Sequence, residues 1–207
     1  MKVVEPGSSS GGLLARCTSI LLHPLATWDV IAGEEVGVGE LYRAYVAPLA
    51  AIPALCGALA ILGSGGVRIF GIRLMPSIGA IIGEMLGRYV LTLLGVYGLA
   101  LVLDALAPRF GGQPSRTQAF KLAAYSGTAA WVAGVFLLLP AVGGLVAFLG
   151  GLYSLYLLYL GLPKLMQPEP SRAMPYYFVT LALAFLFMVL TVIATSYLSG
   201  LGGPVTI

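Results

Sequence analysis

The chain has 207 residues, of which 59% are hydrophobic and only 9% are charged, and its formal net charge is +3. Soluble domains carry roughly 25% charged residues, so this composition excludes a soluble globular enzyme, a disordered tail and a nucleic-acid-binding domain with its basic face. It indicates an integral membrane protein of the all-α class. The two cysteines and the single histidine are too few for a disulfide framework or a metal site, so we expect no metal and no cofactor.

Residues 1–43 are predicted to form a cytoplasmic segment that contains an amphipathic helix. Its apolar side chains recur at the three- and four-residue spacing of one helical face, at Leu14, Cys17, Leu21, Leu25, Trp28 and Ala32. Pro24 favours the start of a fresh helix, and Gly33 favours its end. Two interpretations stay open. Either the helix lies on the membrane surface with Trp28 as an interface anchor at headgroup depth, or its apolar face packs on the cytoplasmic ends of the membrane-spanning helices.

The lengths of the apolar stretches predict five membrane-spanning helices, because about 20 residues at about 1.5 Å each cross a hydrocarbon layer roughly 30 Å thick. These helices make up a transmembrane domain at 44–198, with spans at about 44–63, 78–105, 119–139, 142–162 and 175–198. Pro140 and the glycines after it supply the turn between the third and fourth spans. Residues 64–77 form either an interfacial turn or a short re-entrant segment, and residues 199–207 form a short extracytoplasmic tail.

The lysines and arginines favour one orientation of these spans. With the N-terminus in the cytoplasm, eight of the 11 basic residues fall on the cytoplasmic side, Arg68 and Arg73 fall outside, and Arg88 lies within a span. Cytoplasmic loops carry the excess of basic residues in membrane proteins. We therefore expect a cytoplasmic N-terminus and an extracytoplasmic C-terminus.

The second span contains a candidate polar intramembrane site at Glu84 and Arg88. These residues are four apart, so they share one helical face and can form an ion pair. Charged side chains within a membrane tend to face a partner or a water-filled cavity, which favours a pocket for an ion, a proton or a lipid headgroup. The alternative is that the pair extends to water near the end of a long helix and only anchors the span.

Small residues suggest how the first two spans pack. Gly79, Gly83 and Gly87 form two overlapping G-x-x-x-G steps, and Ala50, Ala54 and Ala58 offer a matching smooth face in the first span. Such spacing lets two helices approach closely. Packing within one chain is favoured over a dimer interface.

A tyrosine stripe, Tyr153, Tyr156 and Tyr159, follows one side of the fourth span. Its hydroxyls can hydrogen-bond a lipid headgroup or one another. Alternatively, the rings serve in packing and in the aromatic belt at the membrane interface, which is the commoner role of such residues.

The second half of the chain contains, in order, Ala105-Leu-Ala-Pro-Arg-Phe-Gly-Gly112, Phe120-Lys-Leu-Ala-Ala-Tyr-Ser126, Leu138-Leu-Pro140 and Leu152-Tyr-Ser-Leu-Tyr-Leu-Leu-Tyr-Leu-Gly-Leu-Pro163. Together with the early Leu22-His-Pro-Leu-Ala-Thr-Trp28, this order resembles the bacterial branch of the Ypt-interacting-protein (Yip) family of small polytopic membrane proteins. The resemblance implies five spans, a cytosolic N-terminus and a C-terminus on the opposite side, in a bacterial cytoplasmic (inner) membrane.

The resemblance implies less about function. Eukaryotic members of the family resemble membrane-trafficking factors that engage Rab-type GTPases and associate with other family members. Their acidic D-L-Y-G-P motif is not matched by Glu40-Leu-Tyr-Arg43, so the resemblance does not carry GTPase binding to this chain.

The sequence contains neither a G-x-S-x-G turn nor a phosphate-binding G-x-x-x-x-G-K-[ST] loop. We therefore expect a protein without enzymatic activity that acts through association with membrane lipids or proteins, in membrane organisation or as a trafficking-like scaffold. Its protein partners would be further copies of itself or other membrane proteins. The alternative is a small transporter or channel with a polar site around Glu84 and Arg88.

Overall fold

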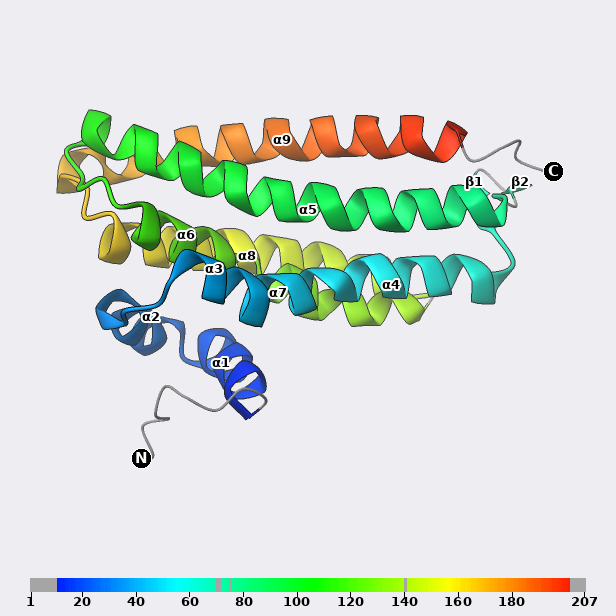
Figure 1. Cartoon of the computed structure of the whole chain (residues 1–207), viewed down its shortest axis with the longest axis horizontal. Helices are drawn as coiled ribbons and strands as arrows, with labels where there is room; N and C mark the ends of the chain where they lie inside the picture. The colour runs from blue at the N-terminus through cyan, green and yellow to red at the C-terminus, as the bar shows by residue number, and fades with distance from the viewer. Residues whose placement is uncertain (1–10, 70–71, 75, 140, 202–207) are drawn as a thin grey trace.

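The computed structural model describes residues 11–69, 72–74, 76–139 and 141–201. Residues 1–10 of the expected N-terminal segment, Pro140 and residues 202–207 of the expected tail lie outside the described residues. Within the described part, five helical segments are long and apolar enough to cross a membrane, at Val38–Ser64, Ile78–Phe110, Arg116–Leu138, Gly143–Leu165 and Pro170–Leu190. They form an elongated bundle with two shorter helices at one end (Figure 1). The expected class, an all-α membrane protein with five spans after a helical segment, is confirmed.

The first span is a continuous helix in three parts: α3 (Val38–Leu41), a π-helical turn (Tyr42–Val46) and α4 (Ala47–Ser64). It begins ahead of the apolar stretch expected at 44–63, because Leu41 is buried in the core and extends the packed face of the helix. The helix ends at Gly65, whose φ of 68° lies in the left-handed region that glycine adopts without strain.

A short β-hairpin connects the first span to the second. Strand β1 (Val67–Ile69) pairs antiparallel with β2 (Ile72–Leu74), and Val67 lies opposite Leu74. These two strands lie in the segment 64–77, for which the sequence left open an interfacial turn or a short re-entrant piece. The next helix, α5 (Ile78–Leu106), starts at Ser77, whose hydroxyl accepts a hydrogen bond from the backbone N–H of Ala80 at 3.1 Å.

The third span consists of three short pieces rather than the single helix expected at 119–139. They are α6 (Arg116–Ser126), α7 (Thr128–Ala133) and a 3-10 turn, η3 (Gly134–Leu138). In its most apolar stretch 61% of the residues are buried, against 11% to 22% in the other four spans. α6 packs on α5 and on α8 (Gly143–Leu165), while α7 packs on α4 and α8. The third span is therefore the centre of the bundle.

The last span, α9 (Ala173–Leu201), is the most peripheral of the five. It follows a 3-10 turn at Pro170–Arg172 and packs chiefly along α5 (Figure 1). The pocket described below lies where α9 and α5 meet the inner helices.

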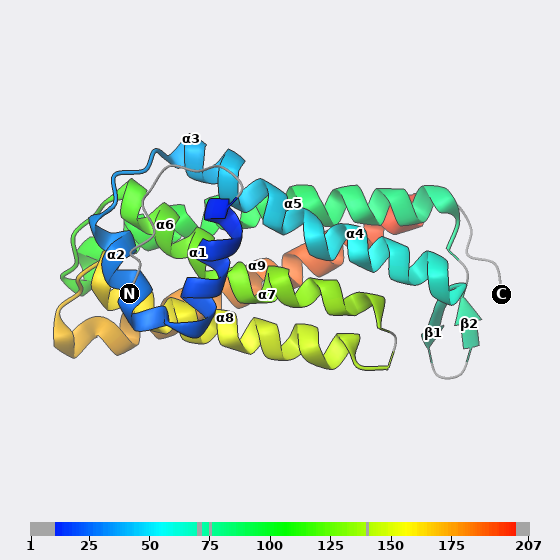
Figure 2. The same ribbon diagram turned by 90° about the horizontal axis from the view of Figure 1, so that it is seen from below.

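The N-terminal helices α1 (Gly11–Leu22) and α2 (Pro24–Gly33) cover the end of the bundle away from the β-hairpin (Figure 2). α1 packs on α7, and α2 packs on α8. Pro24 lies in the first turn of α2, where its missing N–H costs no hydrogen bond.

Candidate functional site

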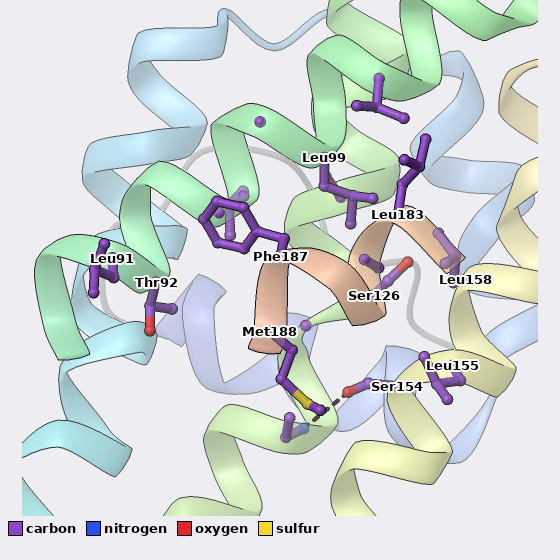
Figure 3. Close-up of a pocket in the computed structure, with 18 of the residues that line it drawn as sticks. Leu91, Thr92, Leu99, Ser126, Ser154, Leu155, Leu158, Leu183, Phe187 and Met188 are labelled. Carbon is purple, nitrogen blue, oxygen red and sulfur yellow. Dashed lines mark hydrogen bonds between the residues drawn. The ribbon is translucent and has the colours of Figure 1, made fainter. Parts of the chain in front are cut away.

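A pocket of about 690 Å³ lies between α5, α7, α8 and α9, within the membrane-crossing part of the bundle. Ligand pockets of proteins typically measure roughly 300–1,000 Å³. Leu99, Leu155, Leu158 and Leu183 surround the pocket from three different helices (Figure 3). Most of the wall is hydrocarbon, so the pocket suits an apolar ligand.

The hydroxyl groups on the pocket wall bond to the backbone of the bundle itself. Ser154 accepts a hydrogen bond from the backbone N–H of Ala130 at 3.0 Å (Figure 3). Ser126 donates to the carbonyl of Leu122 at 2.6 Å, and Thr92 donates to the carbonyl of Arg88 at 2.8 Å. These bonds satisfy the hydroxyls inside the membrane and leave a mainly apolar surface for an occupant.

Two glycines of α5 shape the wall of this pocket. A Cβ atom at Gly95 would lie 2.5 Å from the ring of Phe187, so α9 approaches α5 closely only because position 95 has no side chain. At Gly98, by contrast, a Cβ atom would meet nothing within 4 Å. At Gly95 the ring of Phe187 therefore fills the space beside α5. At Gly98, one turn further along the helix, the space is free.

Arg88 is the charged residue on the pocket wall. Its Nη2 donates to Oε1 of Glu84 at 2.5 Å, one helical turn away. The two side chains are 46% and 30% exposed. The structure therefore pairs the two residues that the sequence singled out, and it brings one of them to the pocket.

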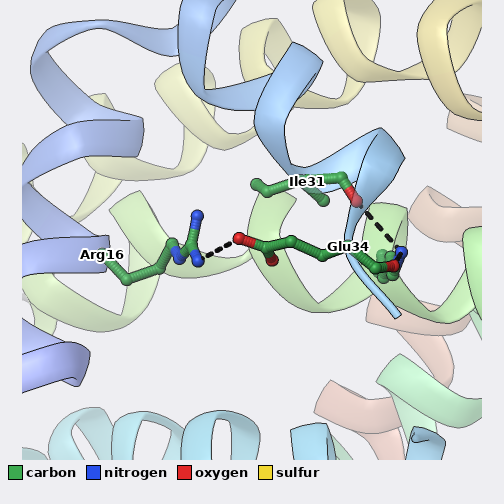
Figure 4. A network of polar contacts seen from close by, with 4 residues as sticks. Arg16, Ile31 and Glu34 are labelled. Carbon is green, nitrogen blue, oxygen red and sulfur yellow. Dashed lines mark hydrogen bonds and ion pairs between the residues drawn. The ribbon is translucent and has the colours of Figure 1, made fainter. Parts of the chain in front are cut away.

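A second polar cluster, the N-terminal clamp (Arg16, Glu34 and Lys121), joins the N-terminal helices to the centre of the bundle (Figure 4). Arg16 forms an ion pair with the carboxylate of Glu34. Lys121 is 1% exposed, and its Nζ donates to the carbonyl of Ile31 at 3.0 Å and to the carbonyl of Glu34. These carbonyls lie at the C-terminal end of α2, where a helix leaves carbonyls without internal partners and attracts a cation.

Two further side chains hold α2 against the bundle. Lys164 of α8 forms an ion pair with Asp29 and donates to the carbonyl of Leu25 at 3.0 Å. Gln118 of α6 donates to the carbonyl of Ala32 at 3.0 Å. The sequence reasoning treated Lys121 and Lys164 only as cytoplasmic charges. Nothing in the sequence pairs them with α2, because their partners are mainly backbone carbonyls about 90 to 139 residues away along the chain.

Trp28 packs inside the bundle, as the second interpretation of the N-terminal helix expects, and its role as an interface anchor at headgroup depth stays a prediction. Its side chain is completely buried. A Cβ atom at Gly161 would lie 2.7 Å from its ring, and its ring meets that of Tyr125 edge to face at 6.3 Å. Gly161 in α8 leaves room for the indole, so the side chain of Trp28 extends from α2 into the bundle and not into lipid.

The tyrosine stripe divides into one internal and two external residues. The Tyr153 hydroxyl donates to the carbonyl of Leu21 at 2.7 Å and so bonds the end of α1. Tyr156 and Tyr159 are 46% and 41% exposed on the outer surface of α8. None of the three lines the pocket. A role of the outer pair in lipid contact stays a prediction.

The small-residue faces of the first two spans lie on helices that pack together, α4 and α5. Ala50 and Ala54 are buried and Ala58 is half-buried. Gly83 and Gly87 are half-buried, whereas Gly79 is exposed. That these glycines and alanines face one another stays a prediction.

In the described part of the chain, no three His, Cys, Asp or Glu side chains come together in a way that could hold a metal ion. Cys17 is buried and lies 3.7 Å from the Tyr45 hydroxyl. Its burial raises the pKa of the thiol, because the thiolate would lose hydration. Cys17 is therefore held as a weakly reactive thiol at neutral pH.

Comparison with known proteins identifies the family of this chain. A sequence model of the Yip1 domain matches residues 18–193, which is most of the chain. The chain belongs to the Yip1 domain family. The resemblance to the Yip family is thereby confirmed, and the protein is a membrane protein of that family.

The Yip1 domain of this chain has relatives in Escherichia coli. It is 27% identical over 194 residues to the inner membrane protein YohC of Escherichia coli strain K12, covering 91% of this chain and 98% of YohC. The YohC of Escherichia coli O6:H1 strain CFT073 matches to the same extent. No solved structure matches the chain.

The Pro-Arg-Phe-Gly-Gly run that carried the resemblance has a structural role in this Yip1 domain. Gly111 has a φ of 71°, and a Cβ atom at Gly112 would lie 2.6 Å from the carbonyl oxygen of Met166. The run therefore makes a tight turn against the end of α8. Phe110 stacks on Tyr176 with ring centroids 5.0 Å apart, which ties the same turn to the start of α9.

Proposed function

We propose that this Yip1 domain protein has no enzymatic activity and acts by binding a membrane lipid in the pocket between α5, α7, α8 and α9. The observation that carries the proposal is the pocket itself, about 690 Å³ of mainly apolar space within the membrane-crossing part of the bundle. A hydrocarbon occupant makes dispersion contacts with this wall and leaves no polar group unsatisfied. Lipid acyl chains surround such a bundle and are the most available apolar ligands.

We place the protein in the bacterial cytoplasmic membrane, as the name of its relative YohC suggests. The basic residues Lys121, Lys164 and Arg16 meet at the end covered by α1 and α2. Under the positive-inside rule this end faces the cytoplasm. The β-hairpin end then faces the opposite compartment.

The lining supports lipid binding better than transport of an ion. Arg88 and Thr92 give one end of the pocket some polarity, but the lining further along α5 consists of Gly95, Val96, Gly98, Leu99 and Val102. An ion that entered would exchange its water for hydrocarbon, at a cost of many kcal/mol. An acyl chain meets no such barrier.

Filling the pocket tests the proposal. Leucine at position 98 would occupy the free space that Gly98 leaves, so Gly98→Leu should displace a bound lipid. Gly151→Leu is the matched control: a Cβ atom there also meets nothing within 4 Å, but Gly151 does not line the pocket. Native mass spectrometry of protein purified in mild detergent counts the lipids retained on each variant.

We expect the unaltered protein and Gly151→Leu to retain lipid and Gly98→Leu to lose most of it. Far-UV circular dichroism should show the same helical content in all three. Equal retention by Gly98→Leu and the unaltered protein would show that the lipid binds elsewhere, and absence of lipid from the unaltered protein would refute lipid binding.

A further inference from the structure

The pocket is asymmetric along its length. Arg88 is the lining residue of α5 nearest to Ile78, and Val102 is the one furthest from it. These 14 residues of helix correspond to about 21 Å. One half of the hydrocarbon layer is roughly 15 Å deep. The pocket is thus charged at one end, apolar at the other, and long enough for a full acyl chain.

The charges on α5 place the polar end near a membrane interface. Glu84 and Asp104 are 20 residues apart, or about 30 Å along the helix, which equals the usual hydrocarbon thickness. If each carboxylate lies at an interface, Arg88 lies one turn below the headgroups on the β-hairpin side. A guanidinium at that depth reaches headgroup oxygens by extending along the helix.

The pair at this end carries both signs of charge. Arg88 uses one guanidinium nitrogen on Glu84, and the fork of five N–H donors leaves others that can donate to a phosphate. Glu84 receives one bond on Oε1, and its second oxygen can accept another. A guanidinium and a carboxylate side by side complement a headgroup that has a phosphate and a hydrogen-bonding cation.

We propose that the pocket selects a zwitterionic phospholipid with a primary ammonium in its headgroup. The phosphate binds the Arg88 guanidinium, the ammonium donates to Glu84, and one acyl chain runs along α5 past Gly95 and Gly98. This assignment rests on the proposed lipid-binding function and adds the class of lipid.

The neighbouring carboxylate explains the selection. A net anionic headgroup brings its phosphate to Arg88 but has no cation for Glu84, so the carboxylate oxygen that Arg88 does not bond loses hydration without gaining a donor. A trimethylammonium headgroup has the cation but no N–H to donate. Only the primary ammonium both neutralises Glu84 and hydrogen-bonds to it.

A competition experiment tests the selection. The protein is freed of lipid in detergent and given equimolar phosphatidylethanolamine, phosphatidylglycerol and phosphatidylcholine with identical acyl chains, and native mass spectrometry reports the bound ratio. We expect phosphatidylethanolamine to exceed each competitor by about tenfold, the value of one charge-assisted hydrogen bond at a partly exposed site. Glu84→Gln should reduce this ratio to near one while the total lipid bound stays similar.

Asp104→Asn is the matched control, because it neutralises a carboxylate on the same helix that pairs with Arg116 at 3.8 Å at the other end. It should leave the preference intact, whereas Arg88→Gln should weaken binding of all three lipids. Equal binding of the three lipids by the unaltered protein, or a preference that Glu84→Gln leaves unchanged, or one that Asp104→Asn abolishes equally, would overturn the headgroup assignment. Binding of none of the three would instead overturn the lipid-binding function itself.

Discussion

Lys121 is a charged side chain that the fold encloses almost completely. Removing an ammonium group from water costs several kcal/mol unless hydrogen bonds replace its hydration. The carbonyls of Ile31 and Glu34 supply those bonds, and the carboxylate of Glu34, which pairs with Arg16, adds a nearby negative charge. The lysine therefore stabilises the packed position of α2, and α2 in turn supplies the oxygens that make the buried lysine tolerable.

Removing this ammonium group should loosen the N-terminal helices. Lys121→Met keeps most of the side-chain volume but leaves two carbonyls without their donor, so we expect the free energy of unfolding to fall by about 1–3 kcal/mol. Hydrogen–deuterium exchange should become faster at the backbone amides of α2. Denaturant unfolding in detergent micelles measures the first effect, and mass spectrometry of peptides measures the second.

Arg172→Met gives the comparison for that variant. Arg172 pairs with Glu169 at 3.1 Å, but both side chains are more than half exposed. Exposed ion pairs contribute about 0–1 kcal/mol, so this variant should differ little from the unaltered protein. If both variants lower stability equally, Lys121 has no special role in holding α2.

At the scale of single elements, one close contact between spans involves Gly134 at the start of η3. A Cβ atom there would lie 2.7 Å from Cβ and 2.8 Å from Cα of Pro53 in α4. Proline has a rigid ring, and its backbone atoms cannot move without moving the helix. The central span and the first span are therefore held at a distance that only glycine permits.

A larger residue at this contact should separate the two elements. Gly134→Val should lower the free energy of unfolding by about 1–3 kcal/mol, as overpacking of an interior typically does. Gly144→Val introduces the same side chain where a Cβ atom meets nothing within 4 Å, and it should cost less. Thermal unfolding of both variants in the same detergent compares them. A smaller effect at 134 than at 144 would contradict the packing described.

The structure of individual elements was only partly predictable from the sequence. Apolar length predicts spans well, because hydrocarbon thickness sets the number of residues required. It does not show that the third span breaks at Gly127 and Gly134, since Gly127 packs on the ring of Trp131 and Gly134 packs on Pro53 of the first span, which is distant in the sequence. Nor does it predict that the side chain of Trp28 points into the bundle, because the sequence period of an amphipathic helix is the same whether its apolar face meets lipid or protein.

At the scale of the whole molecule, an odd number of spans predicts that the two ends of the chain lie on opposite sides of the membrane. We expect a cysteine introduced at Lys2 to react from the cytoplasmic side and one introduced at Thr206 to react from the other side, with Cys17 and Cys56 replaced by serine. A membrane-impermeant maleimide applied to intact cells and to inverted membrane vesicles measures this. Labelling of both positions from one side would contradict the five-span topology.

The candidate site also emerged only in part from the sequence. Glu84 and Arg88 stand out because charges are rare within a span, and their spacing of four fixes their pairing. The pocket is contributed by short pieces of several helices, and no local pattern links Gly98 to Ser154 or Leu183. Their proximity depends on the order in which the spans pack, which apolar length leaves undetermined.

The central position of the third span has a consequence for biosynthesis. This span has the lowest mean hydropathy of the five described spans and the largest buried share, and it begins with Arg116 and includes Lys121. The translocon releases a segment into lipid according to its own hydrophobicity, so a weakly apolar segment enters unaided with difficulty. Its partners α5 and α4 are synthesised before it and α8 after it. Stable integration of the third span therefore depends on its neighbours and is complete only when α8 has emerged and packed on it.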